Sequence, residues 1–257
     1  MPPTHPFFDH PGPLAMAHRG FSTDGLENSM TAVAAAVDLG YRYVETDVRA
    51  TLDGVAVAFH DATLDRVTDG TGAVAEQPWS RVHRALIGGR EPIPTVEELL
   101  GTWPDLRLNL DVKSDPAVGP LARAIERTRS HQRVCVASFS DARRRAVLRR
   151  LTAPVATSAG LHTVAMFRAA SALRLTPVLR AGLRRIDCLQ VPERFRFIDV
   201  ATAAVVADAH AAGLQVHVWT VNEASRMNAL LDLGVDGIVT DRADILRDVL
   251  TARGAWF

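Results

Sequence analysis

The stretch LAMAHRGFSTDGLENSMTAVAAAVDLGYRYVETD, residues 14–47, contains a complete strand–helix–strand pattern. Short apolar runs of strand length stand at its two ends, Leu14–Ala17 and Tyr43–Asp47. Between them an apolar stripe with spacing i, i+3, i+4 and i+7 begins at Met30, and Gly40 stands where a helix C-terminus favours a left-handed residue. Strands that alternate with helices predict a parallel sheet.

The same pattern continues through the rest of the chain. A second helical unit contains Met227, Leu230 and Leu231 and is followed by Gly234. Six more runs of strand length follow the first two: Leu106–Asp111, Val134–Ser138, Val155–Thr157, Cys188–Val191, Gln215–Thr220 and Gly237–Thr240. Eight strands in 257 residues predict an α/β fold, a (β/α)₈ TIM barrel, for which roughly 250 residues is typical.

One segment, at about 49–103, is too long for a single strand-to-helix connection. Within it Val55–Phe59 alternates like an extra strand, and Thr68–Gly72 predicts a tight turn. Thr95 and Glu98 have the spacing of a capping box and predict a short helix that resumes the barrel. We therefore expect one domain over residues 1–257, with a small insertion after the second strand that folds over the barrel mouth.

Composition limits the range of functions. The chain is 47% hydrophobic and carries 29 basic and 29 acidic residues, so no basic surplus points to nucleic acid. No apolar run approaches the ~20 residues that span a bilayer, and Met1–Pro13 lacks the pattern of a signal peptide. Cys135 and Cys188 lie in different predicted strands, where free thiols act as small buried hydrophobes. We expect a reduced, cytoplasmic protein.

Ionisable residues gather at the predicted strand ends. His18 follows the first strand, Glu45 and Asp47 end the second, Asp111 ends the third, and the insertion carries His60. Because active sites of this barrel lie at the C-terminal ends of the strands, these side chains are expected to converge. Carboxylates at i and i+2 of a strand share one face, so Glu45 and Asp47 can hold one divalent cation. Two imidazoles beside it can act as general acid and base.

Other interpretations remain open for several of these residues. His60 could be an ordinary turn residue, and Trp219 could be a core residue. Lys113 could lie in a solvated loop, but it is the only lysine among 29 basic residues and lies two positions beyond Asp111. Glu27 could orient His18 or cap the following helix. The remaining histidines, His217 among them, are interpreted as structural or surface residues.

Together these motifs closely resemble the glycerophosphodiester phosphodiesterase family, from about residue 14 to about residue 250. The residues that carry the resemblance are His18-Arg19-Gly20, Glu27-Asn28, Glu45-Thr46-Asp47-Val48, His60-Asp61-Ala62-Thr63-Leu64-Asp65-Arg66-Val67-Thr68, Pro92-Ile93-Pro94-Thr95, Asp111-Val112-Lys113, Val218-Trp219-Thr220-Val221-Asn222 and Gly234-Val235-Asp236-Gly237-Ile238.

The resemblance implies a metal-dependent phosphoric diester hydrolase that converts small-molecule glycerophosphodiesters to sn-glycerol 3-phosphate and an alcohol. It implies one divalent cation, Mg²⁺ or Ca²⁺, and oxygen ligands also suit Mn²⁺. The roles that it implies are acid and base for His18 and His60, metal ligands for Glu45, Asp47 and Asp111, and substrate contacts for Arg19, Lys113 and Trp219. The family more often has glutamate where this chain has Asp111, which is one methylene shorter.

Two alternative functions use the same fold. A phospholipase D-like enzyme acting on lysophospholipids or sphingomyelin would need an apolar groove or a membrane-facing loop, and in the insertion only Phe59 and Trp79 suggest one. A catalytically silent phosphodiester-binding barrel would have lost a histidine or a ligand, whereas here every position is filled apart from the Glu-to-Asp change. The partner expected in either case is a small molecule, and the oligomeric state is left open.

Overall fold

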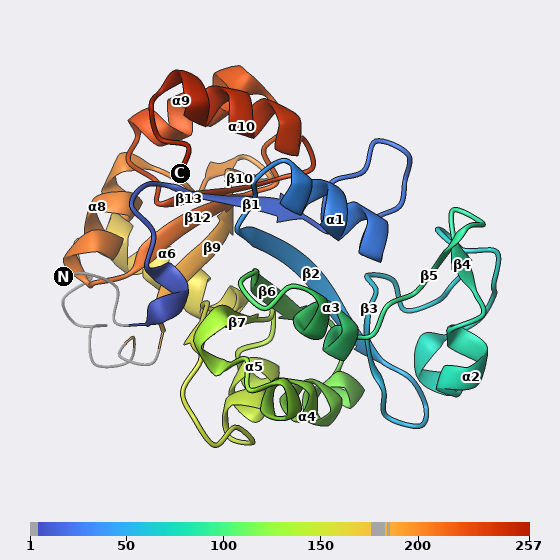
Figure 1. Cartoon of the computed structure of the whole chain (residues 1–257). Coiled ribbons are helices and arrows are strands. Elements are labelled where there is room, and N and C mark those ends of the chain that lie inside the picture. The colour runs from blue at the N-terminus through green and yellow to red at the C-terminus, as the bar shows by residue number, and fades with distance from the viewer. Residues whose placement is uncertain (1–4, 176–182, 184–185) are drawn as a thin grey trace.

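A computed structural model describes residues 5–175, 183 and 186–257, which form a nearly closed barrel of eight parallel strands (Figure 1). Neighbours around the ring follow the order β8-β7-β6-β2-β1-β13-β12-β9, and a single bridge between Ser158 and Cys188 joins its two ends. Every predicted strand is present, and the second extends furthest beyond its predicted end. The strands are β1 Leu14–His18, β2 Tyr43–Ala50, β6 Arg107–Val112, β7 Val134–Ala137, β8 Ala156–Thr157, β9 Cys188–Pro192, β12 Gln215–Trp219 and β13 Gly237–Thr240.

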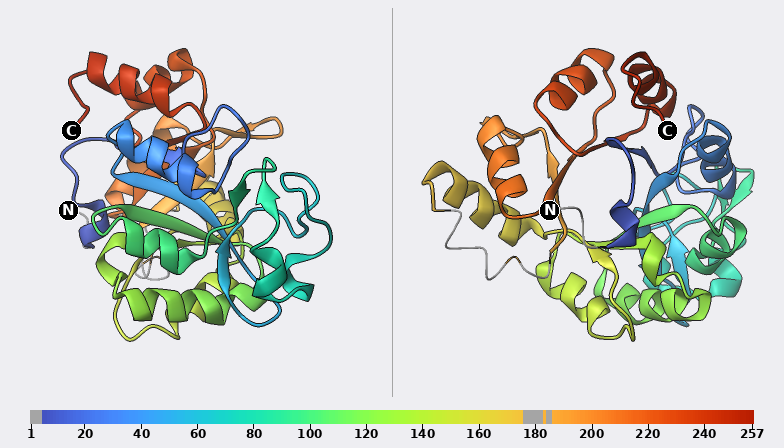
Figure 2. Two further views of the ribbon diagram at one scale, coloured as in Figure 1. Left: turned by 45° about the vertical axis from the view of Figure 1, so that its right-hand side comes forward. Right: turned by 60° about the vertical axis from the view of Figure 1, so that its left-hand side comes forward.

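Helices surround this ring (Figure 2). The side chain of Ser29 caps the N-terminus of the first helix, α1 (Met30–Asp38). Gly40 follows the C-terminus of this helix with φ of 93°, and this left-handed glycine is the one that the sequence predicts. The most buried residues of α1 are Ala32, Val33 and Ala36, so the buried face is turned slightly from the predicted stripe. The helices that follow the barrel strands in turn are α1 Met30–Asp38, α3 Val96–Thr102, α4 Val118–Thr128, α5 Asp141–Leu148, α6 Leu161–Ala172, α8 Ala203–Ala211, α9 Ala224–Asp232 and α10 Ala243–Ala252. Two short 3₁₀ turns flank α4: Asp115–Ala117 lies directly before it, and His131–Arg133 lies between it and β7.

The barrel interior is filled by its own apolar cluster. Leu14 and Met16 of β1 belong to this inner cluster, whereas the alternate residues Ala15 and Ala17 pack in the outer core between strands and helices. A 3₁₀ turn, η1 Pro6–Phe8, brings two buried phenylalanines into the inner cluster. The proline-rich N-terminal segment therefore contributes aromatic side chains to the core.

Residues between β2 and β6 form the insertion that the sequence predicts. The predicted extra strand is present as β3 Ala56–Ala58, which pairs antiparallel with β2. Because β2 continues to Ala50, the segment outside the barrel strands begins two residues later than expected. Thr95 and Glu98 make both hydrogen bonds of the capping box. The other short elements are η2 Val74–Glu76, α2 Trp79–Val82, β4 Leu86–Ile87 and β5 Glu91–Pro92.

A row of polar side chains crosses the barrel interior. Nε2 of Gln190 donates to Oδ1 of Asn109 at 3.1 Å and lies 3.4 Å from Nδ1 of the fully buried His217. The other ring nitrogen of His217, Nε2, lies 2.9 Å from Oε1 of Gln215 and donates to it. This arrangement suits a neutral imidazole, because a proton on Nδ1 would face the amide donor of Gln190. Burial lowers the pKa of His217 to about 4.

The neutral His217 makes stability depend on pH. An unfolded chain binds this proton near pH 6.5 and the folded chain near pH 4, so the stability contributed by the neutral imidazole is lost as the pH falls through this window. We expect the free energy of unfolding to fall by about 3 kcal/mol more in the wild-type protein than in His217→Gln between pH 7 and pH 4. Urea unfolding at a series of pH values measures this, and equal slopes for the two proteins would contradict it.

Candidate active site

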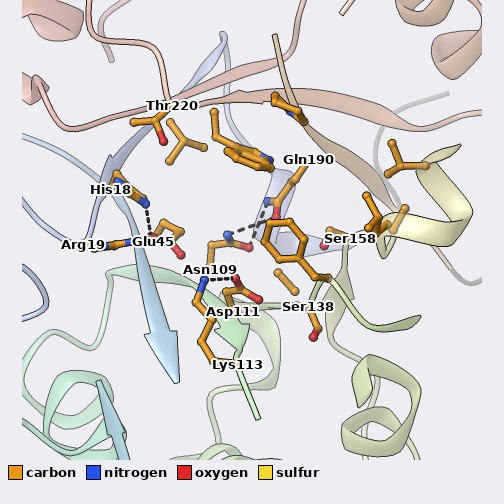
Figure 3. A pocket seen from close by; sticks show the side chains of 18 of the residues that line it. His18, Arg19, Glu45, Asn109, Asp111, Lys113, Ser138, Ser158, Gln190 and Thr220 are labelled. Atoms are coloured by element: carbon orange, nitrogen blue, oxygen red, sulfur yellow. Dashed lines mark hydrogen bonds and ion pairs between the residues drawn. The ribbon is translucent and has the colours of Figure 1, made fainter. Parts of the chain in front are cut away.

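Strand register brings the predicted site residues together at one end of the barrel. His18 of β1 pairs with Glu45 of β2, and Asp47 of β2 pairs with Asp111 of β6. Since the three strands are parallel neighbours, these side chains meet at their C-terminal ends. They surround a pocket of about 240 Å³, shown in Figure 3, which His60 also lines.

Three carboxylates form a group that could hold a metal ion. One ligand oxygen from each of Glu45, Asp47 and Asp111 lies within 4.8 Å of the others, and all three residues are buried. Oε2 of Glu45 and Oδ1 of Asp111 are buried without a hydrogen-bond partner. Burial and the neighbouring charge of Asp47 raise the pKa of Glu45 to about 7. Buried anionic oxygens without sufficient compensation fit a divalent cation, and an all-oxygen donor set favours Mg²⁺, Ca²⁺ or Mn²⁺ over Zn²⁺.

Two cationic side chains balance part of this negative charge. Nζ of Lys113 lies 2.7 Å from Oδ1 of Asp47 and 2.6 Å from Oδ2 of Asp111. Nε of Arg19 lies 2.9 Å from Oδ2 of Asp47. Burial opposes ionisation of Asp47, but these cations outweigh it and lower the pKa of Asp47. Asp47 is fully buried, whereas both cations line the pocket and can reach a bound anion.

A carboxylate beyond the strand ends orients His18. Nδ1 of His18 donates to Oδ1 of Asp241 at 2.6 Å, and Nδ2 of Asn222 donates to the other oxygen of Asp241 at 2.8 Å. Burial alone would lower the pKa of His18, but Asp241 and Glu45 outweigh it and raise this pKa. With Nδ1 occupied, Nε2 is the nitrogen left for proton transfer, 3.7 Å from Oε2 of Glu45.

The insertion holds His60 in a similar way. Nδ1 of His60 donates to Oδ1 of Asp61 at 2.6 Å. The hydrogen bond from Arg66 is the main cause that lowers the pKa of Asp61 to about 2, so this carboxylate is ionised at neutral pH. Arg66 also donates to Oε1 of Glu27 at 2.7 Å, and Glu27 in turn accepts from Arg19 at 2.8 Å. Ion pairs of alternating charge therefore connect Asp61 in the insertion, through Arg66, Glu27 and Arg19, to Asp47 of the three buried carboxylates.

The backbone of the His18-Arg19-Gly20 motif is left-handed at two positions. Arg19 and Gly20 both have positive φ, 58° and 83°. A Cβ atom at Gly20 would lie 2.6 Å from the backbone carbon of Ala32, so no larger residue fits here. The close approach lets α1 pack directly against the strand end that carries His18 and Arg19.

The opposite wall of the pocket is apolar. It comes from the loop after β7, the first turn of α6 and the ends of β9 and β12, and its members are Phe139, Leu161, Val164, Pro192 and Trp219. The rings of Phe139 and Trp219 meet edge to face with centroids 5.7 Å apart. Trp219 lines the pocket and also packs against the inner core.

The structure places all the predicted site residues around the pocket or directly behind it. Sequence reasoning missed Asp241, and it also missed the apolar wall that begins at Phe139. Neither alternative offered for Glu27 is correct, because it pairs with Arg19 and Arg66, while Ser29 caps the helix. Asp241 follows the strand ending at Thr240, and an acidic residue directly after the last barrel strand was the available signal.

Comparison with known proteins agrees with this geometry. A model described as the "Glycerophosphoryl diester phosphodiesterase family" matches residues 18–245. A Mycobacterium tuberculosis protein named "Probable glycerophosphodiester phosphodiesterase 2" is 49% identical over 99% of this chain and 97% of its own length. A glycerophosphodiester phosphodiesterase of Caldanaerobacter subterraneus is 29% identical over 94% of this chain and 99% of its own. The chain belongs to the glycerophosphodiester phosphodiesterase family.

Solved structures share the barrel. An enzyme of this type from Silicibacter pomeroyi superposes with a TM-score of 0.77 at 23% identity, over 96% of this chain and 97% of its own. An Oleispira antarctica phosphodiesterase, solved with the product sn-glycerol-3-phosphate, gives a TM-score of 0.75 at 23% identity, over 93% and 97% of the two chains. At this identity the likeness shows the fold.

The contact with Asp241 predicts a change in the titration of His18. In Asp241→Asn the carboxylate that favours the imidazolium is lost, so the pKa of His18 should fall. Histidine NMR titration of chelator-treated protein measures this. Asp244→Asn is the matched control, because Asp244 pairs with Arg242 near the start of α10. An unchanged pKa of His18 in Asp241→Asn would contradict the assignment.

Proposed function

We propose that this protein hydrolyses glycerophosphodiesters to sn-glycerol 3-phosphate and an alcohol. The observation that carries the proposal is the placement of two carboxylate-held histidines on a pocket that also contains a buried carboxylate trio. The names of the relatives and the product complex of the Oleispira antarctica protein support this substrate class.

In the proposed reaction Glu45, Asp47 and Asp111 hold one divalent cation, Mg²⁺, Ca²⁺ or Mn²⁺. When bound, this ion supplies Lewis-acid polarisation of a phosphoryl oxygen. Arg19 and Lys113 line the pocket beside the carboxylates and contribute further positive charge toward a bound phosphate. Trp219 forms a wall against the glycerol portion.

The two histidines divide the proton transfers. Each uses Nδ1 to donate to an aspartate, which leaves Nε2 to take a proton from the attacking group or to give one to the departing alcohol. Asp241 and Asp61 fix this tautomer and stabilise each imidazolium as it forms. Which histidine is the acid is settled by the leaving-group experiment below.

A second substrate class has specific support. The apolar wall formed by Phe139, Leu161 and Val164 could accommodate an acyl chain, as a phospholipase D-like enzyme acting on lysophospholipids requires. In the insertion the sequence offers only Phe59 and Trp79 for such a surface, whereas these apolar residues lie on the opposite side of the pocket. The two free buried thiols, Cys135 and Cys188, are in keeping with the proposed cytoplasmic location.

The activity should depend on a divalent cation. With glycerophosphocholine as substrate, release of glycerol 3-phosphate should stop after chelation and return with Mg²⁺, Ca²⁺ or Mn²⁺ more fully than with Zn²⁺. A coupled glycerol 3-phosphate assay across several headgroups measures this, with lysophosphatidylcholine as the acylated comparison. Full activity of metal-stripped protein would refute the cation site, and failure to cleave any acyl-free diester would refute the proposed substrate.

The histidines should respond differently to the leaving group. His18→Ala and His60→Ala should each lower kcat by about 10²–10⁴, the usual contribution of a general acid or base. An aryl phosphodiester needs little protonation of its leaving group, so it should restore activity to the variant that lacks the acid and not to the other. Comparing kcat on aryl and alkyl substrates measures this, and equal losses on both substrates would contradict divided roles.

A further inference from the structure

A small hairpin at the barrel mouth exposes apolar side chains. It consists of β10 Arg194–Phe195 and β11 Ile198–Asp199, directly after β9. Phe197 at its tip is 94% exposed, and Phe195 and Ile198 are more than half exposed. In the left view of Figure 2 the hairpin projects on the same side as the insertion, so its tip lies at the mouth.

Polar contacts anchor the base of the hairpin. Nε of Arg168 in α6 donates to the backbone oxygen of Asp199 at 3.3 Å, and Glu193 forms an ion pair with Arg226 of α9. Nε of Arg194 lies 2.8 Å from Oδ1 of Asp199 within the hairpin. The apolar tip is thus presented by a base that is fixed to two barrel helices.

The hairpin follows a strand that lines the pocket. Pro192, which lines the pocket, stands two residues before the hairpin begins. Phe139 and Leu161 also line the pocket and are 54% and 55% exposed. Exposed apolar side chains therefore occur both in the pocket lining and in the hairpin that follows β9.

We propose that this hairpin docks the barrel mouth onto an anionic lipid surface. Its three exposed apolar side chains offer roughly 400 Å² on the scale of aromatic side-chain areas. That is about half of the ~800 Å² that each partner contributes to a stable protein interface, whereas binding to a lipid surface grows with the apolar area buried and with attraction to anionic lipids.

Charge at the tip agrees with this partner. The guanidinium of Arg196 lies 5.7 Å from the ring centroid of Phe195, and within the described residues it pairs with no carboxylate. A cation beside an inserted aromatic ring is placed to meet anionic headgroups. No helix in the described part of the chain is long and apolar enough to cross a membrane.

Vesicle co-sedimentation tests the proposal without turnover, so its outcome is independent of the proposed function. The probes are phosphatidylcholine vesicles with and without phosphatidylglycerol. We expect the wild-type protein to bind the anionic vesicles, Phe197→Ser to bind about 10- to 100-fold more weakly, and Arg196→Gln to lose about 5-fold on anionic vesicles only. Phe257→Ser is the matched control, because Phe257 is 47% exposed and packs against His10, which precedes the N-terminal end of β1.

Two results would overturn the proposal. One is that the wild-type protein does not sediment with anionic vesicles, or that Phe197→Ser sediments equally well. The other is a dimer in light scattering that Phe197→Ser dissociates, which would assign the hairpin to a second copy of the chain. Hydrolysis of glycerophosphocholine by Phe197→Ser should equal that of the wild-type protein, which shows that the substitution leaves the folded barrel and its pocket intact.

Discussion

The register of β1, β2 and β6 determines where the three buried carboxylates and His18 lie. Parallel pairing places His18 beside Glu45 and Asp47 beside Asp111, so acidic groups from strands far apart in the sequence come within a few ångströms of one another. A shift of one residue in β2 would turn both of its carboxylates away from the pocket, because side chains alternate along a strand. The apolar interior, with Phe7 and Phe8 packed beside Leu14 and Tyr43, holds this register.

Burying three carboxylates together is costly, and the surrounding structure offsets only part of the cost. Lys113 and Arg19 compensate Asp47, but Glu45 retains an oxygen without a hydrogen-bond partner and has a raised pKa. Such incomplete compensation suits a site whose remaining positive charge comes from a bound cation. The ion pairs that run through Glu27 to Arg66 extend this balance to the insertion and hold Asp61 against His60.

The two sides of the mouth have different chemistry. The insertion side is polar and orients His60, whereas the loop after β7, helix α6 and strand β9 contribute apolar side chains to the pocket, and an exposed apolar hairpin follows β9. A phosphodiester lying across the pocket would therefore meet charged groups on one side and an apolar surface on the other. Substitutions in separate loops of one rigid barrel can thus alter the binding of substrate and the contact with a surface independently.

Local patterns in the sequence are enough to predict the barrel and to locate most residues of the candidate site. Short apolar runs predict all eight strands, and Glu45-x-Asp47, Asp111 and Lys113 could be placed because each lies at or just beyond the predicted end of a recognisable strand. These signals are local, because the apolar pattern of a strand or a helix repeats every few residues along the sequence. Three features depend on contacts between distant segments: Asp241 orients His18, Glu27 joins two arginines, and the apolar wall lies opposite the insertion. His18 and Asp241 are 223 residues apart, and a contact of that kind exists only once the last barrel strand has paired with the first.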